Sequence, residues 1–453
     1  MAAALAATTW TSSSAPARAA DYGTPRISLS TPYLSGAVGG TRDPVVTVTV
    51  SQSGAAAADL SVDVSAASRP AVAGPEDVAV AGTATTRTLA VTPRARGYSD
   101  LTVRVTGLGG KSATTRLHYA ASAAVVGAAD TRYLTGSSDA SAAVDVGDGH
   151  TLVADDESNV LRLYGPDGGA PVRTFDVGDA VGAEKEMDLE AGARVGDTVY
   201  WTGSMGNNKD GEYKPDRSTL LATTLTGSGA GTRLTVAGWF RDLRADLVQW
   251  DEDEGDRYGF ADGTADGRIP KEVDGFNVEG LEFLPGSTTT AYVGFRAPLV
   301  PPRDGGKALL VPVTNMSALV DGEPGDGHAH FGTPVELDLG GLSVRDIRRD
   351  AAGHYLVLAG SWSADDNSAP YALYSWDGDP GHAPVRRLTL PTSDYGAWEA
   401  IARTPDDAGA PGARVQLVTD DGEADLYGDG TAAKDLEHEQ WQKSRATWFG
   451  LGG

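Results

Sequence analysis

Residues 272–298 read E-V-D-G-F-N-V-E-G-L-E-F-L-P-G-S-T-T-T-A-Y-V-G-F-R-A-P and show the unit from which most of the chain is built. An apolar run ends at a Pro-Gly-Ser turn at 285–287, and a second apolar run follows at 290–295. This pattern predicts an antiparallel hairpin. The first run contains Glu279, and a carboxylate in a buried strand needs a paired base or a metal ion.

The same pattern, an acidic strand start followed by a turn and an apolar strand, recurs along the chain. It is found at residues 188–202, 341–359 and 398–419, and a first unit covers 142–164. Repeats of roughly 40–50 residues that form four short strands are typical of a β-propeller. We therefore expect an all-β chain in which residues 130–453 form five or six blades. A large double β-sandwich is the alternative.

One spacing leaves the number of blades open. Glu190 and Glu279 are 89 residues apart, which is about twice the length of a blade. Either an additional blade or a large insertion fits this gap. Residues 236–247 within it predict a helix, because Trp239, Phe240, Leu243 and Leu247 share one helical face.

The N-terminal part has a different composition. Residues 26–120 contain seven short stretches of alternating apolar and polar residues, separated by Gly- and Pro-containing turns, which predicts an immunoglobulin-like β-sandwich. Small residues at 121–129 predict a linker. Residues 1–25 contain an Ala-Arg-Ala pattern at 17–19, and we interpret them as the remnant of a signal peptide and a linker. A secreted, extracellular protein is expected.

The overall charge limits the classes of partner. The 62 acidic and 37 basic residues give a net charge of −25, which disfavours nucleic acid and favours cations. The chain has no cysteine, so disulfides and thiolate metal sites are excluded. It has no apolar run of 18 residues that could span a membrane. We expect a monomer.

Acids at equivalent strand starts predict a shared site. If Glu157, Glu190, Glu279 and Glu399 begin inner strands, their carboxylates converge at one mouth of the central channel. Clustered carboxylates raise one another's pKa unless a cation lies among them, and hard oxygen ligands suit Ca²⁺. The alternative is that each acid caps a strand or pairs with an arginine of the next blade. The predicted metal ligands are Asp156, Glu157, Asp188, Glu190 and Glu279.

Basic residues occur in the same units. Bases next to an acid cluster suggest an anion-binding site, and a cation with bases can hold a phosphoryl or carboxylate group. Salt bridges between blades are the competing interpretation of each base. The predicted substrate-binding residues are Lys209, Arg217, Arg296 and Arg345. The predicted catalytic residues are Glu190, Glu279 and Glu399.

These motifs resemble a family of exported bacterial propeller-like proteins of unknown function, which is similar to the esterase-like phytase family. The resemblance covers residues 130–453 and excludes the N-terminal sandwich. It lies in A-D-D-E-S-N-V-L-R-L-Y at 154–164, the stretch 188–204, N-V-E-G-L-E at 277–282, G-F-R-A-P at 294–298 and V-R-D-I at 344–347. It implies a propeller and phosphoesterase-like chemistry.

Two functions from different classes follow. The first is a secreted, calcium-dependent hydrolase, such as a phosphoesterase, that acts on a small anionic or phosphorylated substrate at the channel. The second is a non-catalytic extracellular propeller that binds a ligand such as a glycan. The second hypothesis is motivated by the lack of a recognisable catalytic motif such as G-x-S-x-G.

Overall fold

The structure is a computed structural model that describes residues 22–40, 42, 44–123, 130–301, 306–321, 327–363, 370–391 and 396–452. Its contacts divide the chain into two units. The first comprises Met1–Leu34, Pro44–Arg94 and Tyr98–Tyr119, and the second comprises Ser35–Asp43, Ala95–Gly97 and Ala120–Gly453. Residues 1–21 of the predicted signal remnant and 124–129 of the predicted linker lie outside the described residues.

The described part of residues 26–122 forms two four-stranded sheets, and residues 35–37, 97 and 120–122 of their strands belong to the second unit. Alternate residues of β3 are buried and exposed, as the alternating sequence at 45–51 predicted. All seven predicted strands are present, and β2 is additional; the narrower immunoglobulin-like assignment stays a prediction. In sheet order, the strands are β1 (Arg26–Leu29), β3 (Val45–Ser51), β6 (Thr86–Val91) and β5 (Val78–Ala81), and then β2 (Tyr33–Ala37), β8 (Ser112–Ser122), β7 (Gly97–Thr106) and β4 (Ser61–Ala67).

The described residues of the second unit form five four-stranded antiparallel sheets. The first two sheets are β10 (Ala140–Gly147), β11 (His150–Asp155), β12 (Ser158–Tyr164) and β13 (Arg173–Asp176), and β14 (Leu189–Val195), β15 (Thr198–Gly203), β16 (Leu220–Thr226) and β17 (Arg233–Phe240). The next two are β18 (Asn277–Phe283), β19 (Ala291–Ala297), β20 (Ala308–Val313) and β21 (Val335–Leu337), and β22 (Ser343–Arg349), β23 (Tyr355–Gly360), β24 (Tyr371–Trp376) and β25 (Val385–Leu390). The fifth is β26 (Ala397–Arg403), β27 (Arg414–Asp420), β28 (Lys443–Gly450) and β9 (Thr131–Thr135).

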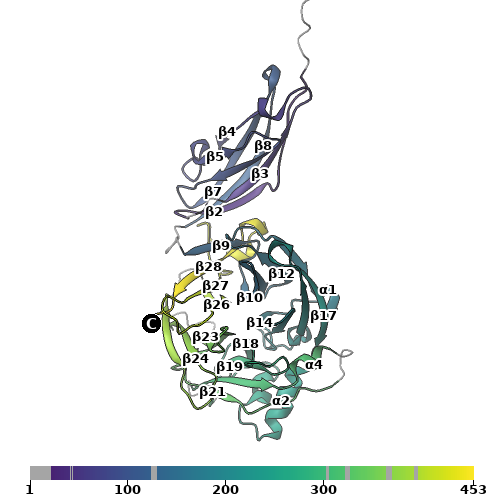
Figure 1. The fold of residues 1–453 in the computed structure, drawn as a ribbon, viewed down its shortest axis with the longest axis vertical. Helices are drawn as coiled ribbons and strands as arrows, with labels where there is room; N and C mark the ends of the chain where they lie inside the picture. The colour runs from purple at the N-terminus through teal and green to yellow at the C-terminus, as the bar shows by residue number, and fades with distance from the viewer. Residues whose placement is uncertain are drawn as a thin grey trace, which may run out of the picture. The chain divides into compact units, whose positions relative to one another are not determined.

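The five sheets form a closed ring. The inner strands contact one another in the order β10, β14, β18, β22 and β26, and β26 contacts β10 again (Figure 1). β9 completes the fifth sheet by pairing with β28, so strands from the two ends of this unit close the ring. This is the arrangement of a β-propeller with five blades. A closed ring of inner strands is incompatible with the alternative double sandwich.

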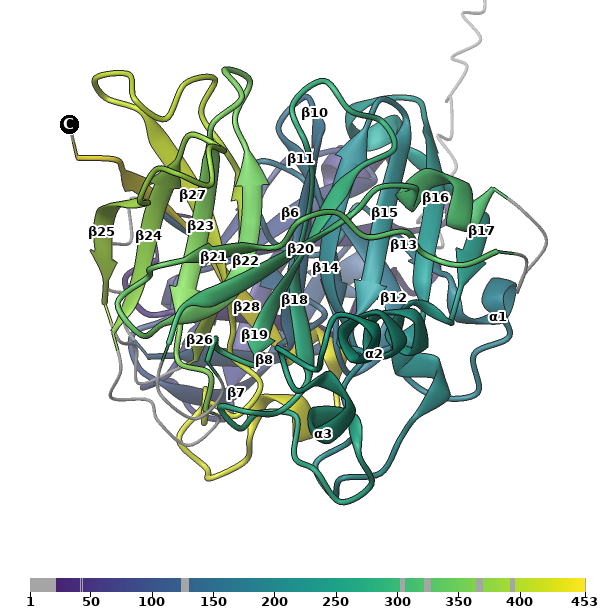
Figure 2. The same cartoon turned by 90° about the horizontal axis from the view of Figure 1, so that it is seen from below.

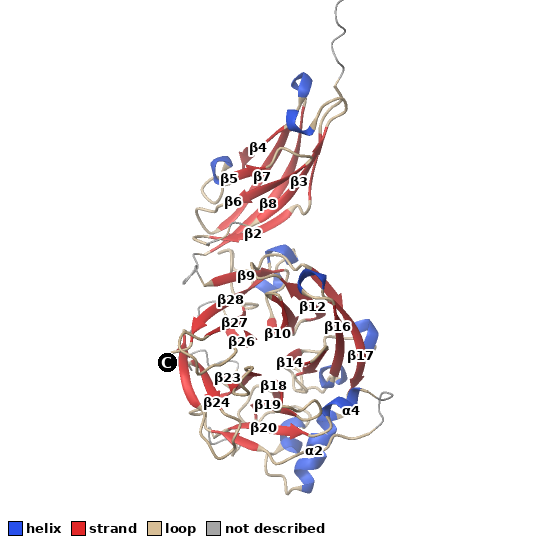
Figure 3. Ribbon diagram, viewed as in Figure 1, coloured by secondary structure: helices blue, strands red, loops and turns tan. Residues whose placement is uncertain are grey.

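The long gap between Glu190 and Glu279 is an insertion and not an additional blade. It contains α2 (Leu243–Asp253) and α3 (Phe260–Thr264), and Figure 3 shows α1 (Gly178–Val181), α2 and α4 (Met316–Val320) outside the ring of strands. The predicted helix at 236–247 was therefore wrong in its first half. Residues 236–240 belong to β17, which pairs with β16 along its length, and sheet pairing outweighs the helical spacing of the apolar residues.

Neighbouring sheets pack face to face. β18, β19 and β20 are neighbouring strands of one sheet (Figure 2), and every residue in them is buried, including the charged Glu279, Glu282 and Arg296. A Cβ atom on Gly280 or Gly294 would lie 3.0 or 3.1 Å from Val344 Cγ1 of the next sheet, so glycine allows this close approach. No helix in the described part of the chain is long and apolar enough to cross a membrane.

The closing strand gives a stability prediction. Leu134 in β9 is 6% exposed and packs with Ala140, Val153 and Val418 of the first and fifth sheets. Leu134→Ala should lower the free energy of unfolding by about 2–4 kcal/mol, because it leaves a cavity at the closure. Chemical denaturation measures this value. Val385→Ala on the exposed strand β25 is the matched control, and equal losses for the two variants would contradict the role of β9.

Candidate functional site

Each inner strand has a β-bulge at the same place near its start. In all five blades, the inner strand pairs with the second strand of the same sheet, and the register of this pairing skips one residue of the inner strand. A bulge turns a side chain away from the regular pleat, and bulges are frequent next to active sites. The five skipped residues, one for each blade, are Ser141, Glu190, Glu279, Arg345 and Glu399.

Arg345 lies between two of these glutamates. Its Nε atom is 3.0 Å from Glu279 Oε2 and donates to Glu399 Oε2 at 2.8 Å, and its Nη2 contacts Glu399 Oε1. Arg296, at the end of β19, donates to Glu279 Oε1 at 2.9 Å. Burial opposes the ionisation of Glu279, but Arg345 and Arg296 outweigh it and hold its pKa below the usual value. Glu279 and Glu399 are therefore committed to ion pairs.

Glu190 lies among other acids instead. Oxygen atoms of Glu190, Asp188 and Asp156 lie within 4.8 Å of one another. Burial, then the charges of Glu279 and Asp188, raise the pKa of Glu190 well above its usual value. Burial, then the charge of Glu190, likewise raises the pKa of Asp156. Like charges this close are costly in a buried site unless protons or a cation neutralise them.

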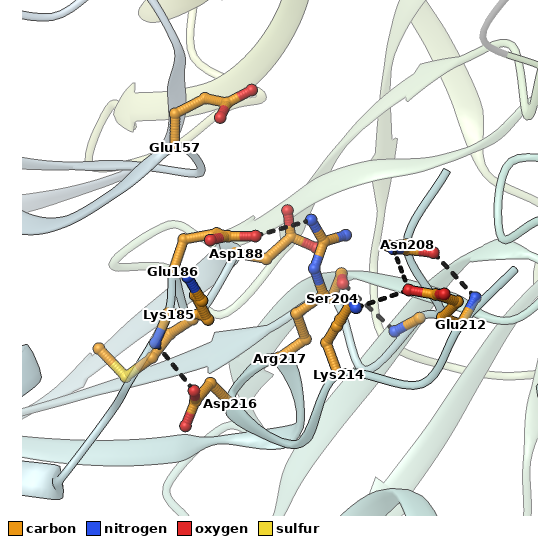
Figure 4. A network of polar contacts seen from close by, with 12 residues as sticks. Glu157, Lys185, Glu186, Asp188, Ser204, Asn208, Glu212, Lys214, Asp216 and Arg217 are labelled. Carbon is orange, nitrogen blue, oxygen red and sulfur yellow. Dashed lines mark hydrogen bonds and ion pairs between the residues drawn. The ribbon is translucent and has the colours of Figure 1, made fainter. Parts of the chain in front are cut away.

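Two further features of this group suggest a ligand. Asp156 Oδ1 is buried and has no hydrogen-bond partner among the described residues. Asp188 has a positive φ of 52°, which is uncommon outside glycine and is frequent at functional sites. Its carbonyl accepts a hydrogen bond from Ser204 N at 2.9 Å, and its Oδ2 is 3.0 Å from Arg217 Nη1 (Figure 4). Asp188 thus joins the cluster from a left-handed position directly before β14.

The structure separates the five predicted metal ligands. Asp156, Asp188 and Glu190 come together, whereas Glu279 is held by arginines. Glu157 lies between β11 and β12, is exposed, has Lys434 Nζ at 3.9 Å and stands apart in Figure 4. The prediction that Glu157 begins an inner strand was wrong, because the inner strand of its blade is β10.

The predicted bases are also separated. Arg296 and Arg345 are buried in the ion pairs described above. Arg217 contacts Asp188 and Glu186, and Lys209 is exposed in the loop that follows β15. Only Arg217 and Lys209 are therefore placed to meet a ligand from solution. The catalytic and substrate-binding roles themselves stay predictions.

Two charged residues at this site were not predicted. Asp420 ends β27 opposite Ala397, as Asp155 ends β11 opposite Ala140, so the acid pairs at 155–156 and 420–421 occupy equivalent strand ends. The repeated acid pair was therefore a sequence signal that could have predicted Asp420 as part of this site. Lys271 acts electrostatically on Asp156, Glu190, Glu279 and Asp420. It lies in the insertion before β18, where no repeat pattern points to it.

The oxygen cluster fits a hard divalent cation. Asp156, Asp188 and Glu190 offer carboxylate oxygens only, which are the ligands that Ca²⁺ prefers. The described residues contain a second group with metal-binding potential, Asp350, His354 and Asp407, away from the bulges. Asp350 in that group already accepts hydrogen bonds from the backbone amides of His354 and Ala408. The first group is thus the better candidate.

Comparisons with known proteins leave the family open. No family model and no curated protein matches the chain, so the resemblance to the esterase-like phytase family stays a prediction. Among solved structures, glutaminyl cyclase from Myxococcus xanthus matches with 12% identity and a TM-score of 0.33 over 71% of this chain and 95% of that chain. A luciferin-regenerating enzyme matches with 9% identity and a TM-score of 0.31 over 79% and 88%.

A third solved structure, virginiamycin B lyase from Staphylococcus aureus, matches with 8% identity and a TM-score of 0.27 over 93% of this chain and 98% of that chain. Similarity at this level assigns neither an activity nor a ligand. The function has to be argued from the site.

The ion pairs of Arg345 give a prediction. Arg345→Met should lower the free energy of unfolding by about 3–5 kcal/mol, because Glu399 loses its partner and Glu279 keeps only Arg296. Chemical denaturation at pH 7 measures the loss. Arg386→Met on the exposed part of β25 is the control and should change stability by less than about 0.5 kcal/mol. An Arg345→Met variant with the same free energy of unfolding as wild type would show that the network contributes no stability.

Buried acids near the same mouth predict a pH dependence. Burial, then the charge of Asp420, raises the pKa of Asp139 to about 7. The folded state therefore holds this proton above the pH at which the unfolded chain releases it. The associated stability is present at low pH and disappears as pH rises through about 7.

In a chelator-containing buffer, the protein should lose stability between pH 6 and pH 8. Asp139→Asn should reduce this loss by roughly 1 kcal/mol. Thermal unfolding followed by circular dichroism at both pH values measures it. The exposed Asp210→Asn variant should behave as wild type. A pH dependence that is identical in all three proteins would exclude Asp139 as its source.

Proposed function

We propose that the second unit is a hydrolase of anionic esters, with phosphate esters as the main candidates, and that it works with a divalent cation, Ca²⁺ foremost. Asp156, Asp188 and Glu190 would hold the cation. The observation that supports this most strongly is the buried Asp156 Oδ1, which has no partner among the described residues and lies within a carboxylate cluster. The secreted location inferred from residues 1–25 belongs to the same proposal.

The protein residues around the cluster have distinct tasks in this proposal. Arg217 fixes the Asp188 carboxylate through its 3.0 Å ion pair. Glu279 and Glu399, held by Arg345, keep the adjacent wall of the channel rigid and are too strongly paired to accept a proton from water. Of the three predicted catalytic residues, this leaves Glu190, which would bind the cation through one carboxylate oxygen and act as the acid–base group through the other.

Positive charge for an anionic substrate comes from three side chains. Lys271 acts electrostatically on the acid cluster, Arg217 contacts it, and exposed Lys209 follows β15. A bound cation would supply a Lewis acid for the ester oxygen and lower the pKa of a coordinated water. The chain itself orients the anion and excludes bulk water from the buried carboxylates.

One observation favours the non-catalytic alternative. Two of the three predicted catalytic glutamates are ion-paired, so a conventional pair of acid and base carboxylates is missing from this group of described residues. A propeller that only binds a cation and an anionic ligand, such as an acidic glycan, would need the same cluster and no general base. Turnover distinguishes the two functions.

The cation site can be tested directly. Calorimetric titration of the chelated full-length protein with CaCl₂ should show binding, and Asp188→Asn and Glu190→Gln should weaken it at least tenfold because each removes a ligand charge. Glu157→Gln is the matched control, since Glu157 is an exposed acid outside the cluster. Loss of binding in Glu157→Gln together with wild-type binding in Asp188→Asn would contradict the assignment.

The reaction needs a separate experiment. Hydrolysis of phytate and of a model phosphate monoester, with Ca²⁺ and with chelator, should show activity only with the cation, and Glu190→Gln should reduce it at least a hundredfold. A protein that binds Ca²⁺ but hydrolyses no ester supports the binding propeller. A protein that hydrolyses the esters equally well in chelator rules out a role for the cation.

A further inference from the structure

The opposite end of the channel contains a cavity of about 210 Å³. All five inner strands contribute to its lining through their later residues, whereas the bulges lie near their starts. Arg194 follows Glu190 by four positions and Arg403 follows Glu399 by four, which on an extended strand is about 13 Å. The cavity is therefore a separate site on the same axis.

Arg348 forms a barrier between the two ends. From β22 it donates to Leu281 O of β18 at 3.2 Å and to Ala143 O of β10 at 2.9 Å, so its guanidinium crosses the channel. It also pairs with Asp346 Oδ1 at 2.9 Å and is 7% exposed. Its Nε atom is buried and has no hydrogen-bond partner among the described residues. The floor of the cavity is thus a guanidinium group that is paired with Asp346 and retains one unused donor.

Three more arginines surround the cavity, each from a different blade. Arg194 donates to the carbonyls of Gly196 and Asp145, Arg349 donates to Leu284 O at 3.4 Å, and Arg403 donates to Thr151 Oγ1. Within the described ranges none of these three forms an ion pair, although the chain has a net charge of −25. A guanidinium group has five N–H donors, so most donors of Arg194, Arg349 and Arg403 have no partner among the described residues.

The lining also contains three acids, and backbone amides donate to Asp145 Oδ1 and to both oxygens of Glu282 and Asp350. Asp145 accepts from Gly147 N, and Glu282 accepts from Phe283 N and Arg349 N. Asp350 accepts from His354 N and Ala408 N. These carboxylates stabilise the strand ends and the loops that follow them. Among the described residues none of them forms an ion pair with Arg194, Arg349 or Arg403, although Glu282 interacts electrostatically with Arg348 and Arg349.

We propose that this cavity is an anion-binding site that accepts a phosphate group between Arg194, Arg349 and Arg403, above the floor formed by Arg348. Planar guanidinium groups match the oxygens of a phosphate in paired hydrogen bonds, which a point charge such as lysine does not provide. The volume also accommodates a small molecule attached to the phosphate. The site is independent of the proposed cation site and of hydrolysis.

The test is calorimetric titration of the full-length protein with inorganic phosphate and, separately, with glycerol 3-phosphate; glycerol is the blank. Wild type should bind at least one phosphate compound, and Arg194→Gln and Arg403→Gln should each weaken binding at least fivefold. Arg386→Gln, an exposed arginine on β25, is the matched control and should bind as wild type. Equal affinity for both compounds indicates free phosphate, and tighter binding of glycerol 3-phosphate indicates a phosphorylated metabolite.

The variants should retain the wild-type thermal unfolding temperature without phosphate, since each loses only contacts to a carbonyl or a hydroxyl. In wild type, phosphate should raise that temperature, and in both variants the shift should be smaller. The proposal is overturned if phosphate gives neither heat nor a thermal shift at millimolar concentration, or if both variants bind as wild type. The Ca²⁺ titration of Arg403→Gln should match that of wild type. A failure of the proposed phosphate site can therefore be distinguished from a failure of the proposed cation site.

Discussion

The guanidinium of Arg345 lies between the carboxylates of Glu279 and Glu399, and the organisation of the channel depends on this contact. All three side chains are buried, and they come from three successive inner strands. Charges in such a place are tolerated only when they are paired with good geometry. Arg345 satisfies this condition for two blades at once, with Arg296 as a second partner for Glu279. The pairing links neighbouring blades at the axis.

The same ring explains why the remaining acids lie close together. Five equivalent bulge positions carry three glutamates, one arginine and one serine. The arginine neutralises the side of the ring formed by Glu279 and Glu399, and Glu190 on the other side meets Asp156 and Asp188. An acid cluster that only Arg217 contacts directly, through Asp188, thus arises among the described residues where the repeat departs from its own symmetry. The bulge geometry is common to all blades, and only the residue types differ.

The charge distribution along the channel is uneven. Acids dominate near the starts of the inner strands, and arginines gather near their ends, with Arg348 across the middle. In a protein with a large net negative charge, four arginines thus gather around one cavity, next to the acids Asp145, Glu282 and Asp350. The two proposed sites would take ligands of opposite charge, and Arg348 lies between them.

The repeated hairpins, the alternating strands of residues 26–120 and the apolar runs of the blades were readable in the sequence, because strand periodicity and turn residues are local signals. Asp188 and Glu190 were recognisable for the same reason, as acids at a strand start. The tertiary structure alone decided that there are five blades, that β9 closes the ring and that Arg296 and Arg345 neutralise Glu279 and Glu399 instead of facing a ligand. It also placed Asp420 and Lys271 at the site. These outcomes depend on which strands become neighbours, and contacts between residues hundreds of positions apart leave no local pattern in the chain.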